Sequence, residues 1–189
     1  MKKYIIFAGV NGAGKSTLYQ IMPGFKEIER VNSDEIVKSF GDWKNPDDVM
    51  KAGKYAVRKI AECFQNGTSF NQETTLCGKS ILRNIQKAKS LGYFIELHYV
   101  GIDSAETAKE RIAYRVAHGG HGIPSEIVEK RYTESLANLQ KVMGYTDLAV
   151  IYDNTVRFNR IAIYIGGKLN YEAENLPDWY KNFFDYFKK

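Results

Sequence analysis

The chain has 189 residues, of which 44% are hydrophobic and 26% charged, and its formal net charge at pH 7 is +5. This balance is typical of a globular protein, and the length fits a single domain over residues 1–189. No apolar run approaches the roughly 20 residues of a membrane-spanning helix, which argues against a membrane protein. We also do not expect a nucleic-acid partner, because the Lys and Arg residues form no tract of five or more.

The N-terminus and the cysteines indicate a cytoplasmic protein. Met1-Lys2-Lys3 precedes an apolar segment that is shorter than the core of a secretory signal, and no small-residue cleavage site follows it. Cys63 and Cys77 are too few for a disulfide framework and lie in no metal-ligand pattern. We expect both thiols to be reduced and to serve in packing.

The strongest motif follows the first apolar run. Residues 9–17 read Gly-Val-Asn-Gly-Ala-Gly-Lys-Ser-Thr, the Gly-x4-Gly-Lys-Ser pattern of a phosphate-binding loop between a strand and a helix. Backbone N–H groups of such a loop and the helix N-terminus bind phosphate. We predict that Lys15 reaches the β- and γ-phosphates and that Ser16 binds Mg²⁺. The predicted ATP-binding residues of the loop are Asn11, Gly12, Ala13, Gly14, Lys15, Ser16 and Thr17.

Strand-like and helical segments alternate along the chain. Apolar runs predict strands at residues 3–8, 27–32, 69–73, 93–100 and 147–152. Between them, helices are expected from Asn45-Pro46 to Asn66-Gly67, at 79–90, from a capping pair of Asp103 and Glu106, and from Pro124 onward. This alternation is typical of βαβ units and a mainly parallel sheet.

The C-terminal part departs from this pattern. Residues 161–165 and 168–171 flank Gly166-Gly167 and predict a β-hairpin. A final helix starts at Pro177-Asp178 and is expected to cover the sheet with Trp179, Phe183, Phe184 and Phe187. The fold class predicted is α/β: a three-layer, P-loop NTPase or nucleotide-kinase-like fold with a mainly parallel sheet, a helical lid, and a C-terminal β-hairpin plus helix.

Asp34 follows the second predicted strand in the sequence Arg30-Val31-Asn32-Ser33-Asp34. Because ligands bind beyond the carboxyl ends of parallel strands, Asp34 should face the γ-phosphate, where it could take the proton of an attacking hydroxyl. The competing interpretation is that Asp34 or Ser33 only caps a helix that begins at Glu35.

Glu73 emerges at the same edge from the third strand, at residues 69–73. It could order Mg²⁺-bound water or hold the acceptor, with Thr75 hydrogen-bonding nearby. Capping of the next helix by Thr74 or Thr75 is the alternative. Glu96 and His98 share one face of the fourth strand, where packing is the default interpretation.

Arginines flank a glycine-rich turn between the third and fourth helices. Arg111 and Arg115 are four residues apart and share a helix face, and Arg131 follows the turn Gly119-Gly120-His121-Gly122. We interpret residues 111–131 as a lid that closes arginines over the phosphates. Surface salt bridges with Glu110 or Glu129 are the alternative. His118 and His121 are interpreted as lid contacts or turn residues.

Together these residues resemble the zeta toxin family of P-loop kinases, particularly its small chromosomal members. The segments that carry the resemblance are Gly9–Thr17, Asn32-Ser33-Asp34, Glu73-Thr74-Thr75-Leu76, Gly92-Tyr93-Phe94-Ile95-Glu96-Leu97, Arg115 to Pro124, Arg131 and Tyr152-Asp153-Asn154. The chain is shorter than the family's toxins, and Lys38 stands where an arginine often follows the aspartate segment.

The resemblance implies ATP as donor and a sugar hydroxyl as acceptor, with UDP-N-acetylglucosamine the acceptor of the better known toxins. It implies that Asp34 and Lys15 are catalytic, that Glu73 binds substrate, and that Arg131 with Arg115 or Arg111 clamps the phosphates. It places Asp153-Asn154 at the adenine, and it makes an antitoxin protein a partner to consider.

The function predicted is therefore a small-molecule kinase that uses ATP and Mg²⁺ and phosphorylates a hydroxyl, with a nucleotide-sugar as the favoured acceptor. Two alternatives stay open at this point. One is a polynucleotide 5′-hydroxyl kinase, which the net charge favours and the dispersed basic residues do not. The other is an ATP-gated interaction module without acceptor chemistry.

Overall fold

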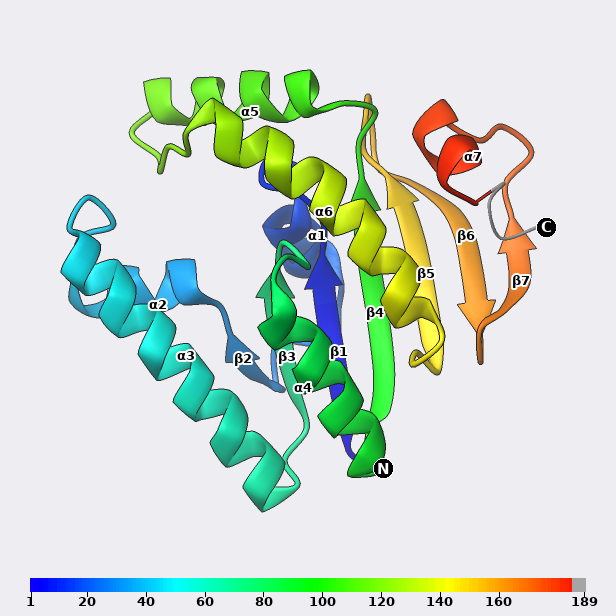
Figure 1. The fold of residues 1–189 in the computed structure, drawn as a ribbon, viewed down its shortest axis with the longest axis horizontal. Helices are drawn as coiled ribbons and strands as arrows, with labels where there is room; N and C mark the ends of the chain where they lie inside the picture. The colour runs from blue at the N-terminus through cyan, green and yellow to red at the C-terminus, as the bar shows by residue number, and fades with distance from the viewer. Residues whose placement is uncertain (185–189) are drawn as a thin grey trace.

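A seven-stranded sheet forms the centre of the structure, a computed structural model that describes residues 1–184 (Figure 1). The strands lie in the order β2-β3-β1-β4-β5-β6-β7. The first five in this order run parallel, and β6 and β7 extend the sheet in antiparallel orientation. The strands are β1 (Lys3–Ala8), β2 (Glu29–Val31), β3 (Phe70–Thr74), β4 (Phe94–Gly101), β5 (Leu148–Asp153), β6 (Asn159–Ile165) and β7 (Lys168–Glu172).

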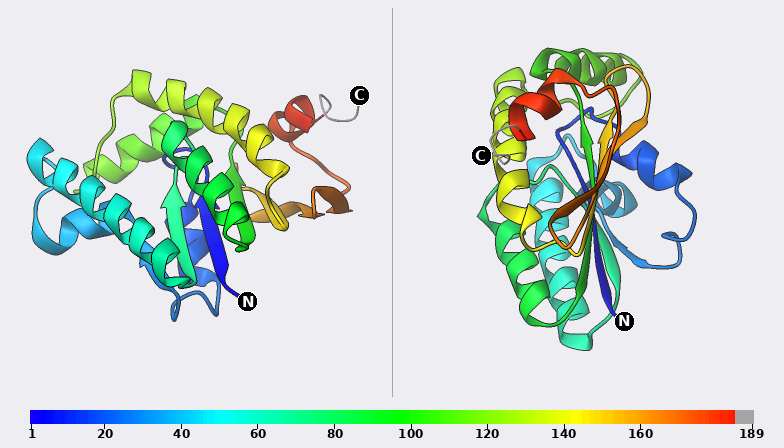
Figure 2. Two further views of the ribbon diagram at one scale, coloured as in Figure 1. Left: turned by 60° about the horizontal axis from the view of Figure 1, so that its bottom comes forward. Right: turned by 90° about the vertical axis from the view of Figure 1, so that its right-hand side faces the viewer.

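Helices cover both faces of the sheet, which confirms the predicted three-layer α/β fold. The edge-on view shows α3, α4 and α6 on one face and α1 on the other (Figure 2). No helix within residues 1–184 is long and apolar enough to cross a membrane. The helices are α1 (Lys15–Ile21), α2 (Ser33–Phe40), α3 (Pro46–Asn66), α4 (Lys79–Ser90), α5 (Ala105–Ala117), α6 (Ser125–Met143) and α7 (Asp178–Phe184).

The central strand β1 is buried on both faces from Tyr4 to Ala8, which explains its apolar sequence there. Successive side chains of a strand point to opposite faces. Tyr4 and Ile6 accordingly join the hydrophobic cluster that includes residues of α3, α4 and α6. Ile5 and Phe7 join the cluster that includes residues of α1 and α5. The continuous apolar run before the phosphate loop is therefore explained by its place in the middle of the sheet.

The predicted N-terminal cap is correct for α3 and wrong for α5. Asn45 caps α3 as expected, since its side chain accepts a hydrogen bond from the N–H of Asp47 and Pro46 takes the first helical position. The expected cap of α5 at Asp103 is wrong by one residue. Ser104 is the cap, and its hydroxyl accepts a hydrogen bond from the N–H of Thr107.

The C-terminal part forms the expected hairpin and helix. β6 and β7 pair in antiparallel orientation on either side of Gly166-Gly167. In α7, the indole Nε1 of Trp179 donates a hydrogen bond of 2.8 Å to Oδ1 of Asp153, and its ring lies over Gly101 at the end of β4. Phe187, expected in the same helix, lies outside the described residues.

Replacing Gly101 by Ala tests how tightly α7 packs on the end of β4. A Cβ atom at residue 101 would lie 2.2 Å from two ring carbons of Trp179, and the bond to Asp153 holds that ring in place. We expect Gly101→Ala to lower the free energy of unfolding by about 1–3 kcal/mol, as overpacking does.

Gly53→Ala in α3 is the matched control, because a Cβ atom there meets no atom within 4 Å. Ala is favoured over Gly inside a helix by about 1 kcal/mol, so this variant should be slightly more stable than the wild type. Urea denaturation measures both changes. Wild-type stability of Gly101→Ala would contradict the tight packing of Trp179.

Candidate functional site

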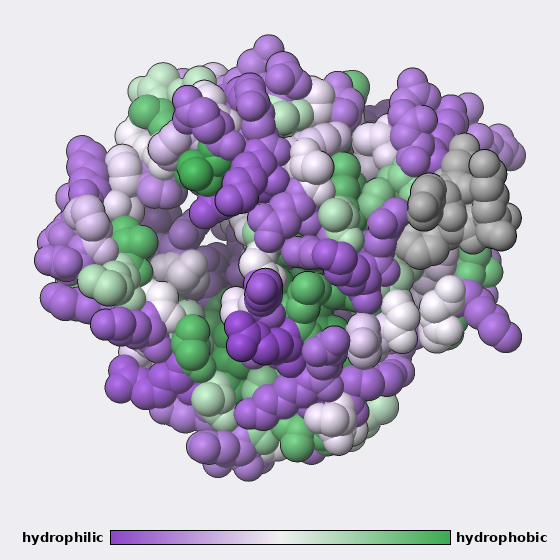
Figure 3. Space-filling view, in the orientation of Figure 1, coloured by the Kyte–Doolittle hydropathy of each residue, from purple (hydrophilic) through white to green (hydrophobic). Residues whose placement is uncertain are grey.

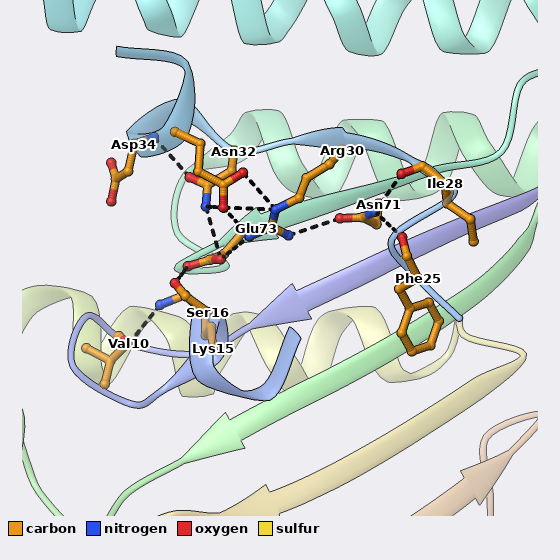
Figure 4. Close-up of polar contacts among 11 residues, drawn as sticks. Val10, Lys15, Ser16, Phe25, Ile28, Arg30, Asn32, Asp34, Asn71 and Glu73 are labelled. Atoms are coloured by element: carbon orange, nitrogen blue, oxygen red, sulfur yellow. Dashed lines mark hydrogen bonds and ion pairs between the residues drawn. The ribbon is translucent and has the colours of Figure 1, made fainter. Parts of the chain in front are cut away.

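The carboxyl ends of β1, β2 and β3 meet at one edge of the sheet. β1 pairs with β3 on one side and β4 on the other, so the crossovers change direction at β1. In an open parallel sheet, ligands bind beyond the strands at such a point. The phosphate loop follows β1, Asp34 follows β2, and Glu73 is the next-to-last residue of β3. The topology therefore brings these predicted residues together (Figure 4).

The backbone of the phosphate loop requires its first glycine. Gly9 has φ +139°, a conformation that residues with a side chain rarely adopt. A Cβ atom at residue 9 would also lie 2.2 Å from the carbonyl oxygen of Val100 on β4. The loop then turns with a hydrogen bond from the Ala13 N–H to the Val10 carbonyl, and Gly14 leads into α1. The expected strand–loop–helix arrangement is confirmed.

Lys15 lies buried inside the loop, with 7% of its surface exposed. Its ammonium group donates a hydrogen bond of 3.0 Å to the carbonyl oxygen of Val10. Burial lowers the pKa of Lys15, while the negative charges of Glu73 and Asp34 act against this shift. The lysine is therefore a desolvated cation that faces two carboxylates, which is a suitable place for the negative charge of a phosphate.

Glu73 connects the phosphate loop to β2 (Figure 4). Its Oε1 accepts a hydrogen bond of 2.8 Å from the Ser16 hydroxyl. Its Oε2 accepts bonds of 2.7 Å from Arg30 and 3.1 Å from the side-chain amide of Asn32. The side chain is only 11% exposed. Each carboxylate oxygen thus has a fixed partner, and the carboxylate holds Ser16 at the mouth of the loop.

Arg30 lies at the centre of this network, although no motif in the sequence singles it out. Its guanidinium group also donates to Glu35 and to Asn71, and it stacks 3.6 Å from the ring centre of Tyr19. Burial alone would lower the pKa of Arg30, but Glu35 and Glu73 raise it. The available signal was a cation in a short strand, two residues before the polar run that starts at Asn32.

Asp34 is exposed in the first turn of α2. The alternative in which Asp34 or Ser33 caps the helix is wrong, because Asn32, directly after β2, caps it by accepting a hydrogen bond of 2.9 Å from the Asp34 N–H. This also explains why β2 is shorter than expected. Within residues 1–184, the Asp34 carboxylate has no hydrogen bond or ion pair, yet its charge acts on Lys15.

Of the three predicted arginines, Arg131 is the one that bonds to a side chain of the phosphate loop. It donates a hydrogen bond of 2.9 Å to Oδ1 of Asn11. Arg115 instead donates bonds of 3.0 and 2.5 Å to the carbonyl oxygen of His121. Among the described residues 1–184, none of these arginines pairs with Glu110 or Glu129, so the surface salt-bridge alternative is wrong.

Arg111 links the phosphate loop to the segment that follows β5. Its guanidinium group donates to the carbonyl oxygens of Gly12 at 3.4 Å, Asn154 at 2.7 Å and Thr155 at 2.8 Å. The Asn154 side chain in turn donates a bond of 2.8 Å to the carbonyl oxygen of Ala13. Arg111 and Asn154 therefore tie the phosphate loop to the segment after β5.

Two predicted residues stay outside these networks. Thr17 is exposed on α1, and within the described part of the chain the Thr75 hydroxyl makes no hydrogen bond. The alternative that Thr74 or Thr75 caps the next helix is wrong, since Gly78 precedes α4. The Thr74 hydroxyl instead accepts a bond from the N–H of Leu76.

The remaining titratable residues singled out in the sequence serve in packing, as expected. Buried Glu96 and His98 are hydrogen-bonded to each other at 2.9 Å, and His98 stacks on Phe7. Cys63 and Cys77 are free thiols, and burial raises the pKa of both. Residues 1–184 contain no group of three or more His, Cys, Asp or Glu that could hold a metal ion.

Solved structures with this fold include complexes with nucleotides or partner proteins. A chain of the AvrRxo1-ORF1:-ORF2 complex with ATP matches with a TM-score of 0.75 and 16% identity, over 97% of this chain but only 63% of that one. The PezAT chromosomal toxin–antitoxin system of Streptococcus pneumoniae matches with a TM-score of 0.62 and 16% identity, over 100% and 85%. At these identities the likeness concerns the fold alone, which is that of P-loop kinases.

Sequence comparison gives the family. An uncharacterized protein of Haemophilus influenzae is 34% identical over 130 residues, which are 69% of this chain and 92% of the relative. The family model AAA_33, described as an AAA domain, matches residues 5–142. The matched region contains the phosphate loop, Asp34, Glu73 and Arg131. The chain therefore belongs to the AAA_33 family.

Proposed function

We propose that the protein is an ATP-dependent kinase that transfers the γ-phosphate to a hydroxyl group of a small molecule. The observation that carries this proposal is the exposed carboxylate of Asp34, which within residues 1–184 has no hydrogen bond or ion pair and whose charge acts on Lys15 of the phosphate-binding loop. Nucleotide binding alone needs the loop, whereas transfer also needs a base near the γ-phosphate. We assign this role to Asp34, whose charge acts on Lys15.

The phosphates of ATP would lie on the loop. The N–H groups of residues 12–16 and the N-terminus of α1 favour negative charge there, and Lys15 replaces its bond to the Val10 carbonyl with one to a phosphate oxygen. Mg²⁺ suits the oxygen donors at this place, the Ser16 hydroxyl and the Glu73 carboxylate. When bound, the ion neutralises charge on the β- and γ-phosphates.

The acceptor hydroxyl would approach from the side of α2. As its oxygen forms a bond to the γ-phosphorus, the bond from that phosphorus to the bridging oxygen breaks and ADP leaves. The Asp34 carboxylate takes the proton of the hydroxyl. We assign residues 111–131 the role of a lid, in which Arg131 and Arg115 stabilise charge on the phosphoryl group in transfer. Arg111 acts through the loop that it braces.

The zeta toxin resemblance supports a nucleotide-sugar acceptor such as UDP-N-acetylglucosamine, and an antitoxin as a protein partner. The fold likeness to the PezAT toxin–antitoxin system is consistent with a protein partner. The experiment that tests the proposed function is incubation of the protein with ATP, Mg²⁺ and a metabolite extract, followed by mass spectrometry. New phosphorylated metabolites are expected. Newly phosphorylated 5′ ends of polynucleotides would favour a polynucleotide kinase. The absence of any phosphorylated product would favour a binding module.

Lys15→Ala tests the phosphate loop. The substitution removes a buried cation of the loop, so the affinity for ATP should fall tenfold or more, at about 1.4 kcal/mol per decade. Isothermal titration calorimetry measures the change. Wild-type affinity in the variant would refute the assignment of the loop.

Asp34→Asn separates a kinase from a binding protein. The cap bond of α2 uses the backbone of Asp34 and the side chain of Asn32, so the variant should fold and bind ATP as the wild type does. Asn cannot accept the proton, and phosphotransfer should drop by about 10²-fold or more. Turnover is followed by ADP release in the presence of the acceptor. A variant with wild-type turnover would contradict the assigned mechanism.

Glu73→Gln tests whether Glu73 holds the site together. The change leaves the Arg30 guanidinium without its buried partner, and we expect a loss of about 3 kcal/mol in the free energy of unfolding. Glu35→Gln is the matched control, because Glu35 pairs with the same guanidinium but is 51% exposed. Glu35→Gln should lower the free energy of unfolding by less than about 1 kcal/mol. Equal losses in urea denaturation would contradict a special role of Glu73.

A further inference from the structure

His121 carries an unusual atom. Its Nδ1 is the one buried side-chain nitrogen or oxygen in residues 1–184 that has no hydrogen-bond partner. Buried polar groups are nearly always hydrogen-bonded, because leaving one unpaired costs about 1–3 kcal/mol. Such an atom at the edge of a site indicates that its partner is supplied by a ligand.

The position of His121 connects the two sides of the site. It lies in the turn between α5 and α6, and its ring packs edge-on against Trp43, 4.8 Å between ring centres, in the loop between α2 and α3. The space-filling view shows the molecule hollowed between the α2–α3 part and α6 (Figure 3). The contact between Trp43 and His121 thus joins the proposed lid to the loop that follows α2, the helix that carries Asp34.

Charged groups from three helices act electrostatically on the His121 ring. Burial lowers the pKa of His121, and the charge of Asp34 on α2 acts against this shift. The cations Arg115 on α5, Arg131 on α6 and Lys38 on α2 lower it further. The imidazole is therefore neutral at pH 7, with one ring nitrogen that donates and one that accepts a hydrogen bond.

The ring nitrogens are not needed to hold the turn. The backbone of His121 is fixed by the two bonds from Arg115 to its carbonyl oxygen. The ring carbons supply the contact with Trp43. An apolar ring of similar shape would keep both features and would remove the unpaired nitrogen.

We propose that His121 binds the acceptor, through a hydrogen bond from its ring to a polar group adjacent to the hydroxyl that Asp34 deprotonates, with Trp43 holding the imidazole in place. This inference rests on the proposed kinase function. It assigns to the acceptor a second hydrogen-bonding group beside the reactive hydroxyl, and it makes His121 a residue that selects the acceptor rather than ATP.

Two variants of His121 test the proposal. His121→Phe keeps a ring against Trp43 and has no nitrogen, whereas His121→Asn places an amide near the position of Nδ1. Rates are measured with the metabolite extract as acceptor, diluted in steps at fixed ATP, and then with ATP varied at fixed extract. Thermal unfolding of both variants is measured in parallel.

For His121→Phe we expect tenfold or greater loss of efficiency toward the acceptor, a KM for ATP within twofold of the wild type, and a melting temperature that is unchanged or higher. A purely structural histidine would instead lower the melting temperature. His121→Asn should recover part of the lost efficiency. Undiminished acceptor use by His121→Phe, equal losses for ATP and acceptor, or a lower melting temperature would overturn the proposal.

The same assay separates failure of this inference from failure of the proposed function. If the wild-type protein phosphorylates nothing in the extract, both are overturned. If wild type and His121→Phe form product equally well, the kinase function stands and the role of His121 is rejected.

Discussion

The carboxylate of Glu73 is the interaction on which the rest of the site depends. It joins Ser16 of the phosphate loop to Arg30 of β2 and to Asn32 directly after that strand, and so fixes three neighbouring strand ends relative to one another. Because Asn32 also caps α2, the position of Asp34 follows from the same network. The loop that would bind phosphate and the carboxylate that would accept a proton are thereby held in one rigid frame.

Local signals made much of this fold predictable. The phosphate loop, the cap at Asn45 and the hairpin around Gly166-Gly167 depend on neighbours in the chain, and each was found where the sequence placed it. Arg30 could not be recognised in this way. Its partners Asn71 and Glu73 lie 41 and 43 residues away, so its role exists only once β2 pairs with β3. The cap of α5 was misplaced by one residue because Asp103 and Ser104 are both good caps.

The predicted arginines divide into two tasks that spacing alone could not separate. Arg111 and Arg115 share a helix face, yet Arg111 binds backbone carbonyls beneath the loop and Arg115 binds the turn. Arg131 touches the loop residue Asn11 directly. The contact beneath the loop and the proposed lid over it would use different parts of the same helical pair, which would account for three cations in one short region.

The most direct test of this account is a crystal structure of the protein with Mg²⁺ and a non-hydrolysable ATP analogue. We expect the phosphates to lie on the loop, Nζ of Lys15 to leave the Val10 carbonyl and contact them, and the γ-phosphate to face Asp34. A triphosphate bound elsewhere, such as in the cavity of about 700 Å³ lined in part by Arg157 and Arg160, would contradict it.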